Sequence, residues 1–261
     1  MQEKTKNKLF NILFALFAVL LCAFELIGGD TFGDELTARL VKITVTRLCG
    51  GAIFLMLTLK LRYRVFGGHD KRLWRGALLC FPALLVVVNN LPIIGLVSGN
   101  ATVERTDLLW LVVLEGIAIG FYEELAFRGF VFPLIMEKTG TSRKGIFLAT
   151  IYSGAVFGLM HLINLFEGAG IGSVILQIGY SFLIGAMCSV VLVKTRNIWL
   201  CVALHAIYDF CGFLVPELGQ GIIWDMVTVI ITAILAVATF VYMLYVFFKT
   251  DLSAADGIYT K

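Results

Sequence analysis

Long apolar runs separated by short polar segments make up most of the chain. A helix needs about 20 apolar residues to cross the hydrocarbon core of a bilayer, and about eight runs reach or approach that length. They lie at residues 8–27, 36–59, 73–97, 107–136, 144–165, 173–193, 198–214 and 222–248. The short alternating segments that would indicate a membrane barrel are missing. The pattern predicts an all-α, polytopic membrane helix bundle.

The composition agrees with a membrane protein. Of the 261 residues, 59% are hydrophobic and 15% are charged, whereas soluble domains carry about 25% charged residues. The mean hydropathy is +0.93. This balance excludes disordered, collagen-like and secreted disulfide-stabilised classes. Since no repeat or linker divides the sequence, residues 1–261 are predicted to form a single transmembrane domain.

The basic residues predict an orientation. With the amino terminus in the cytoplasm, 16 of the 21 Lys and Arg residues fall in inner segments. Short cytoplasmic loops of membrane proteins are enriched in these residues, so both termini are predicted to be cytoplasmic in a multi-pass cell-membrane protein. The run at 8–27 lacks a signal-peptide cleavage site and is interpreted as a retained helix. No basic stripe interleaved with aromatic residues occurs, so the partners are the lipid bilayer and no nucleic acid.

Ionisable side chains inside the apolar runs are the strongest functional signal. A charge at the bilayer centre is energetically costly, so such residues mark either a functional site or a pairing that stabilises the bundle. Four predicted helices carry them; Lys42 and Arg47 in the run at 36–59 are interpreted as snorkelling or loosely paired, and the other three helices each carry a group within about one turn. These groups are Glu123, Glu124 and Arg128 in 107–136, His161 with Phe157 in 144–165, and His205 with Asp209 in 198–214.

Spacing predicts how the first of these groups is arranged. Residues four apart share a helix face, so Glu124 and Arg128 are predicted to form an ion pair. Glu123 lies about 100° around the helix and faces a different neighbour. Alone, the pair would more simply be explained as a contact that stabilises the bundle. The carboxylate of Glu123 is nevertheless left available for chemistry.

The same spacing applies to the two intramembrane histidines. Phe157 is set against His161 and can fix its imidazole by packing, while Asp209 lies beside His205 and can orient that ring. Either histidine by itself would most simply make an interhelical hydrogen bond. The occurrence of all three groups on three helices favours a shared site.

Helix length predicts the depth of these residues. At 1.5 Å per residue, Glu123 and His205 lie near the centres of their helices, whereas His161 lies about 9 Å further outward. For these three side chains to lie close together, the helix that carries His161 must therefore be shifted or tilted toward the cytoplasm. In that arrangement Gly158 would face Ala126 and allow close backbone approach.

The motifs EExxxR, FxxxH and HxxxD, in this order, resemble those of the CPBP family. That family includes intramembrane CAAX prenyl proteases and bacterial bacteriocin-processing, Abi-like and immunity proteins. The resemblance covers residues 107–214, which would be the catalytic core. Asp209 stands where the commonest motif has Asn, so an acceptor replaces a group that can donate to an oxyanion.

The resemblance implies an intramembrane glutamic endopeptidase acting on a membrane-associated protein or peptide. Peptide hydrolysis needs an activated water, a donor for the oxyanion and a proton for the leaving amine. Glu123 is then the general base, His161 helps to hold the water, and His205 is the oxyanion donor. The remaining residues orient or stabilise these groups: Asp209, Glu124 and Arg128.

Other functions stay open. Two histidines and a carboxylate could bind zinc, which would make a zinc-dependent protease, although Met160 stands before His161 and the HExxH signature is missing. A transporter or a non-catalytic membrane partner, such as an immunity protein, could use the same buried groups. The prediction is an enzyme with no cofactor. The six cysteines lie in apolar stretches without metal-ligand spacing and are interpreted as small buried hydrophobic residues.

Overall fold

The computed structural model describes residue 24 and residues 29–67, 76–78, 80–166, 168–249 and 251–259. The predicted span at 8–27 lies outside these residues apart from Phe24. Helices account for most of the described chain, which is an all-α bundle with one two-stranded sheet. The principal elements are α2 (Glu35–Lys60), α4 (Phe81–Val88), α5 (Ile93–Ser98), β1 (Ala101–Val103), α6 (Leu109–Glu124), α7 (Phe132–Thr139), α8 (Arg143–Met160), α9 (Ile171–Thr195), α10 (Ile198–Leu218), β2 (Gly219–Gly221) and α11 (Met226–Lys249).

Five of the described helices are long and apolar enough to cross a membrane: α2, α8 with its short extension to Leu165, α9, α10 and α11. A sixth helical path runs from α6 through a π-helical segment (Leu125–Val131) into α7. Residues 73–97 were predicted as one span, but the structure has the short helices α4 and α5 there, separated at Asn89–Pro92. Pro92 lacks a backbone N–H and restricts the preceding residue, so a continuous helix ends before it.

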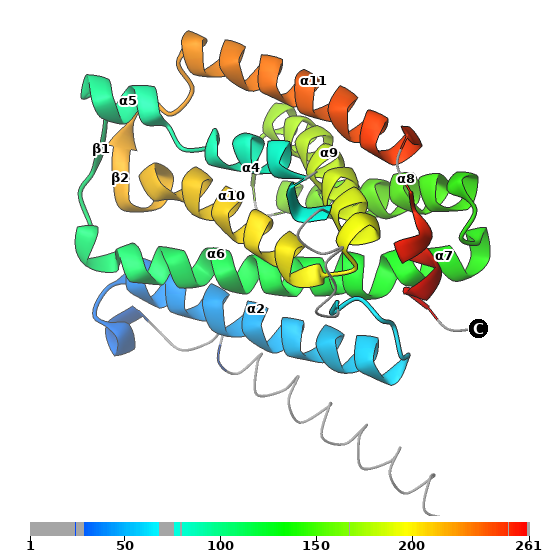
Figure 1. Ribbon diagram of the computed structural model, residues 1–261. Helices are drawn as coiled ribbons and strands as arrows, with labels where there is room; N and C mark the ends of the chain where they lie inside the picture. Colours follow the sequence, from blue (N-terminus) through cyan, green and yellow to red (C-terminus); the bar gives the residue numbers. More distant parts are fainter. Residues whose placement is uncertain are drawn as a thin grey trace, which may run out of the picture.

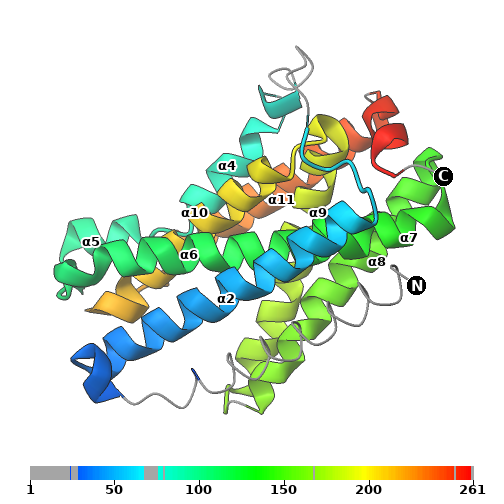
Figure 2. The same cartoon turned by 90° about the horizontal axis from the view of Figure 1, so that it is seen from below.

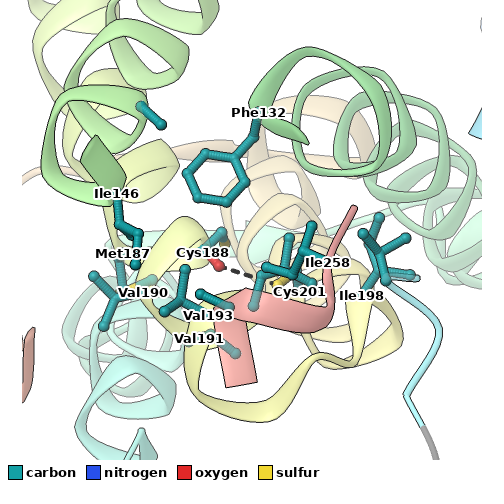
Figure 3. Packing of buried hydrophobic residues seen from close by; sticks show 14 of the residues in the cluster. Phe132, Ile146, Met187, Cys188, Val190, Val191, Val193, Ile198, Cys201 and Ile258 are labelled. Carbon is teal, nitrogen blue, oxygen red and sulfur yellow. Dashed lines mark hydrogen bonds between the residues drawn. The ribbon is translucent and has the colours of Figure 1, made fainter. Parts of the chain in front are cut away.

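Helix α6 occupies the middle of the bundle, with α2 on one side and α10 on the other (Figure 1). Helices α8 and α9 pack as a pair and cross this layer obliquely (Figure 2). The main hydrophobic cluster joins the inner faces of α7, α8, α9 and α11. Figure 3 shows part of it, with Phe132, Ile146 and Met187 turned toward one another.

Two polar ends bound the bundle. At one end β1 pairs antiparallel with β2, Thr102 opposite Gln220, and Arg105 pairs with Asp34 and Asp107. At the other end, α2 and α11 finish in lysines and α8 begins with Arg143. Acidic residues and strands therefore lie opposite the basic helix ends, which is the separation that the predicted orientation requires.

Side-chain caps define where the helices near the site begin. The backbone N–H of Gly145 donates to Ser142 Oγ at the start of α8. At the start of α10, the N–H of Trp199 donates to Asn197 Oδ1 over 2.9 Å. These caps satisfy amides that the first helical turn leaves unpaired. The cap at Asn197 also limits the α9–α10 connection to a short turn, which fixes α10 beside α9.

Candidate active site

Glu124 and Arg128 form a buried ion pair at the centre of the bundle. Glu124 ends α6, and Arg128 lies in the π-helical segment that follows. Both side chains are fully buried, and Arg128 Nη1 donates to Glu124 Oε1 over 3.1 Å. The structure thus contains the predicted ion pair. A buried carboxylate and guanidinium in a membrane stabilise each other only as a pair, because either charge alone would be uncompensated.

The helix around this pair changes its register. As one straight α-helix, the apolar run at 107–136 would be about 45 Å long, which exceeds the hydrocarbon core of about 30 Å. The path instead stays helical and widens into the π-helical segment directly after Glu124, while Pro133 lies in the first turn of α7. Proline is tolerated in a first helical turn, and π-helical segments are frequent at functional sites.

Small residues bring α10 against α6 at the level of the ion pair. A Cβ atom at Gly120 would lie 3.0 Å from Ala206 N and 3.0 Å from Val202 O, and one at Gly116 would lie 3.0 Å from Ala206 O. The two backbones therefore pack as closely as only glycine allows. This approach carries His205 of α10 to the end of α6.

His205 lies among three carboxylate groups. Its Nδ1 is 2.7 Å from Glu124 Oε1, and its Nε2 is 3.6 Å from both Glu123 Oε2 and Asp209 Oδ2. An ionised carboxylate can only accept, so Nδ1 carries a proton and donates to Glu124. Asp209 lies one helical turn from His205, as its spacing predicted.

The two adjacent glutamates have different surroundings. The side chain of Glu124 is 0% exposed, and Arg128 and His205 both contact the same one of its oxygens. The side chain of Glu123 is 15% exposed and approaches only the far nitrogen of His205. Glu123 is therefore the more accessible of the two carboxylates.

Phe157 connects the second histidine to this cluster. Its ring packs edge-on against His161 at 5.3 Å and against His205 at 5.9 Å between centroids. Arg128 Cζ lies 4.6 Å from the centre of the same ring, a cation–π contact. The predicted packing of Phe157 on His161 is present, and the ring reaches the other two groups as well.

His161 meets the cluster only indirectly. Helix α8 ends at Met160, and His161 begins a short 3₁₀ turn in which its Nδ1 donates to the carbonyl of Phe157 over 3.1 Å. Within the part of the chain that the structure describes, no carboxylate lies within ion-pair distance of His161. Among the described residues His161 therefore forms no ion pair with Glu123, and Phe157 is the ring that contacts both His161 and His205.

One predicted contact is wrong. Gly158 was expected to face Ala126, but a Cβ at Gly158 would point at Ile178 and Phe182 of α9. The difference follows from the paired packing of α8 and α9, which turns the small-residue face of α8 toward α9. Phe157, the neighbouring residue, is thereby turned toward Arg128.

The sequence comparison agrees with this geometry. Residues 105–211 match the family model described as Type II CAAX prenyl endopeptidase Rce1-like. This stretch includes every residue of the cluster. The match supports the resemblance to the CPBP/CAAX family of intramembrane proteases. Neither the curated proteins nor the solved structures gave a match to the chain.

The structure does not gather the ligand atoms that the zinc alternative requires. That alternative needs nitrogen atoms of His161 and His205 and an oxygen of Glu123 near one point. Among the described residues, the three ligand atoms are not gathered within 4.8 Å of one another. The residues present therefore do not fit a zinc ion held by these three side chains.

The sequence interpretation missed a different cluster beside Glu124. Cys188 of α9 and Cys201 of α10 are both fully buried, and their sulfur atoms lie within 4.8 Å of each other and of a Glu124 oxygen. The two cysteines are 13 residues apart and follow no metal-ligand spacing. Only their positions on either side of the short α9–α10 turn could have indicated that they meet.

Proposed function

We propose that the chain is a glutamic intramembrane endopeptidase, which hydrolyses a peptide bond of a membrane-associated protein or peptide with a water molecule activated by Glu123. The observation that carries the proposal is the division between the two glutamates. Glu124 is occupied by Arg128 and His205, whereas Glu123 is more exposed and lies 3.6 Å from His205 Nε2. The family match indicates a protease and supports the reaction class.

The proposed reaction begins with proton transfer to Glu123. As the water oxygen attacks the carbonyl carbon, the Glu123 carboxylate accepts one proton of that water. His161 donates Nδ1–H to the Phe157 carbonyl, so its neutral ring has a lone pair at Nε2 that can accept the second hydrogen as a hydrogen bond. For both groups to orient the same water, bound substrate would have to bring the His161 turn closer to Glu123 than it lies here.

His205 is proposed to stabilise the oxyanion. Its Nδ1 already donates to Glu124, and donation from Nε2 as well requires the positively charged imidazolium ring. Glu124, Glu123 and Asp209 surround that ring with negative charge. When the tetrahedral intermediate collapses, the C–N bond breaks and the proton held by Glu123 passes to the leaving amine.

The nature of the substrate follows from the location of the site. Every group of the cluster lies between apolar helices, so a peptide bond must enter from the membrane or at its surface. The expected substrate is therefore a membrane-anchored chain such as a leader peptide, a bacteriocin precursor or a lipid-modified protein. A segment that can unfold locally would also be needed, because an intact helix has no exposed peptide bond.

The test compares cells that produce the parent chain with cells that produce Glu123→Gln at the same level. New protein termini in the membrane fraction, identified by mass spectrometry, should appear only with the parent chain. The variant should still co-purify with the uncleaved substrate. Identical termini in both strains would contradict the proposal. An unchanged cellular phenotype would support a non-catalytic partner, and ion flux in vesicles would support a transporter.

A further inference from the structure

The cysteine cluster behind the proposed active site has the composition of a metal site. Glu124, Cys188 and Cys201 come from α6, α9 and α10, and one ligand atom of each lies within 4.8 Å of the others. Figure 3 shows Cys188 and Cys201 facing each other among apolar side chains, with Cys201 Sγ donating to the Cys188 carbonyl over 3.2 Å. Thiolate and carboxylate groups are the ligands that zinc accepts together.

An unpaired oxygen of Glu124 also indicates a ligand at this cluster. Glu124 Oε1 receives the hydrogen bonds from Arg128 and His205, but Glu124 Oε2 is buried without a hydrogen-bond partner among the described residues. Leaving a buried carboxylate oxygen unpaired is energetically unfavourable. A cation bound at Oε2 would satisfy this oxygen while Oε1 keeps both of its contacts.

We propose that Glu124 Oε2, Cys188 Sγ and Cys201 Sγ form a structural site for a thiophilic divalent cation such as Zn²⁺. Two sulfur ligands of a tetrahedral zinc ion lie about 3.8 Å apart, given Zn–S bonds of about 2.3 Å. The observed separation of at most 4.8 Å needs a contraction of at most about 1 Å to reach that geometry. The site would tie together the three helices that hold the ion pair.

Charge balance supports a divalent ion. Binding requires both thiols to lose a proton, so two protons are released for each ion bound. The two thiolates and the Glu124 carboxylate then carry three negative charges, which balance the two positive charges of the metal and the one of Arg128, while Glu123 and Asp209 compensate the charge proposed on His205. A neutral assembly is what a buried site among membrane helices requires.

The test uses the full chain, purified in detergent with its affinity tag removed, and Cd²⁺ or Zn²⁺ as the probe. One Cd²⁺ per chain should bind and give the ultraviolet absorption of a cadmium–thiolate bond. At a free Zn²⁺ concentration 100 times its Kd, the ratio of folded to unfolded protein should rise about 100-fold. Mg²⁺, which prefers oxygen ligands, should have no effect.

Two variants and one control locate the site. Cys188→Ser and Cys201→Ser should each lose the thiolate absorption and the stabilisation. Cys211→Ser, also buried and on α10, should retain both. In the parent protein, bound Zn²⁺ should protect Cys188 and Cys201 from alkylation in mildly denaturing conditions, a measurement that needs no variant. Equal alkylation with and without Zn²⁺, or no cadmium–thiolate absorption, would overturn the proposal and leave the protease assignment untouched.

Discussion

At the scale of single residues, neighbouring glutamates have separate tasks. Glu124 lies on the face that Arg128 shares one turn later, and α10 places His205 against the same oxygen. Glu123 points toward His205 Nε2 and keeps partial exposure. Glu124 therefore has a structural and electrostatic role, and the proposed chemistry falls to Glu123. Substitution of Glu124 should therefore reduce stability, whereas substitution of Glu123 should reduce the cleavage rate.

Replacing Glu124 should chiefly destabilise the fold. In Glu124→Gln the buried Arg128 loses its counter-charge, and breaking a buried pair in this way costs about 3–5 kcal/mol. Denaturant unfolding of the purified protein in detergent measures the change. The double variant Glu124→Gln/Arg128→Met removes both charges and should recover part of the loss. A single variant as stable as the parent would show that the pair is not buried as described.

Spacing along the helix was sufficient to predict some residue contacts and insufficient for others. The Glu124–Arg128 pair and the Phe157–His161 contact follow from positions four apart, and both are present. The distance between His161 and Glu123 depends on where α8 ends, and the sequence gives no terminating proline or glycine at Met160. Convergence of Cys188 with Cys201 depends on tertiary packing alone.

At the scale of the elements, the close packing of α6 on α10 positions His205. A methyl group at Gly120 would lie 3.0 Å from the backbone of α10, so it would require that helix to shift by a few tenths of an ångström. Gly179 of α9 instead faces open space. These two glycines lie within helices of similar apolar character, so they form a matched pair for testing the role of the interface.

Gly120→Ala should separate α6 from α10 and move His205 away from Glu124. We expect a loss of cleavage of at least about 10-fold, because an ångström-scale displacement of catalytic groups can cost about 100-fold in rate. Gly179→Ala should leave cleavage unchanged and slightly favour the helix. Initial rates on a membrane-anchored peptide in liposomes provide the measurement. Equal rates for the two variants would mean that the α6–α10 contact does not hold the site.

Most helices could be predicted from apolar run length, but two irregular features could not. Asn89 and Asn90 interrupt the predicted span at 73–97 without adding charge, so the run still reads as apolar. The π-helical segment after Glu124 leaves no composition signal, since its residues suit an α-helix equally well. Pro92 prevents one continuous helix at 73–97, although the long apolar run outweighed that signal, whereas the π-helical segment depends on how neighbouring helices pack.

At the scale of the whole molecule, charge separates the two ends of the bundle. The end with β1 and β2 holds Asp34, Asp107 and Glu217, which pair with Arg39 and Arg105, whereas α2 and α11 finish in lysines and α8 begins with Arg143 at the end with α7. The orientation remains a prediction from this asymmetry. It places the two-stranded sheet outside the cell and the α7–α8 turn in the cytoplasm.

Cysteine labelling of intact cells tests the orientation. Gln220→Cys lies at the sheet and should react with a membrane-impermeant maleimide added outside. Ser142→Cys lies in the α7–α8 turn and should react only after the cells are permeabilised. The parent chain, labelled in parallel, corrects for its native cysteines. The reverse pattern would invert the predicted topology without altering the geometry of the site.

The central claim is that Glu123 acts on the water and Glu124 does not. The most direct measurement is the cleavage rate of purified Glu123→Gln in liposomes that contain a substrate peptide, with its unfolding followed in parallel. We predict a loss of about 10²–10⁴-fold in rate, the usual contribution of a general base, at nearly unchanged stability. Glu35→Gln, an exposed position at the start of α2, is the control and should keep the parent rate. Cleavage by Glu123→Gln at the parent rate would contradict the claim.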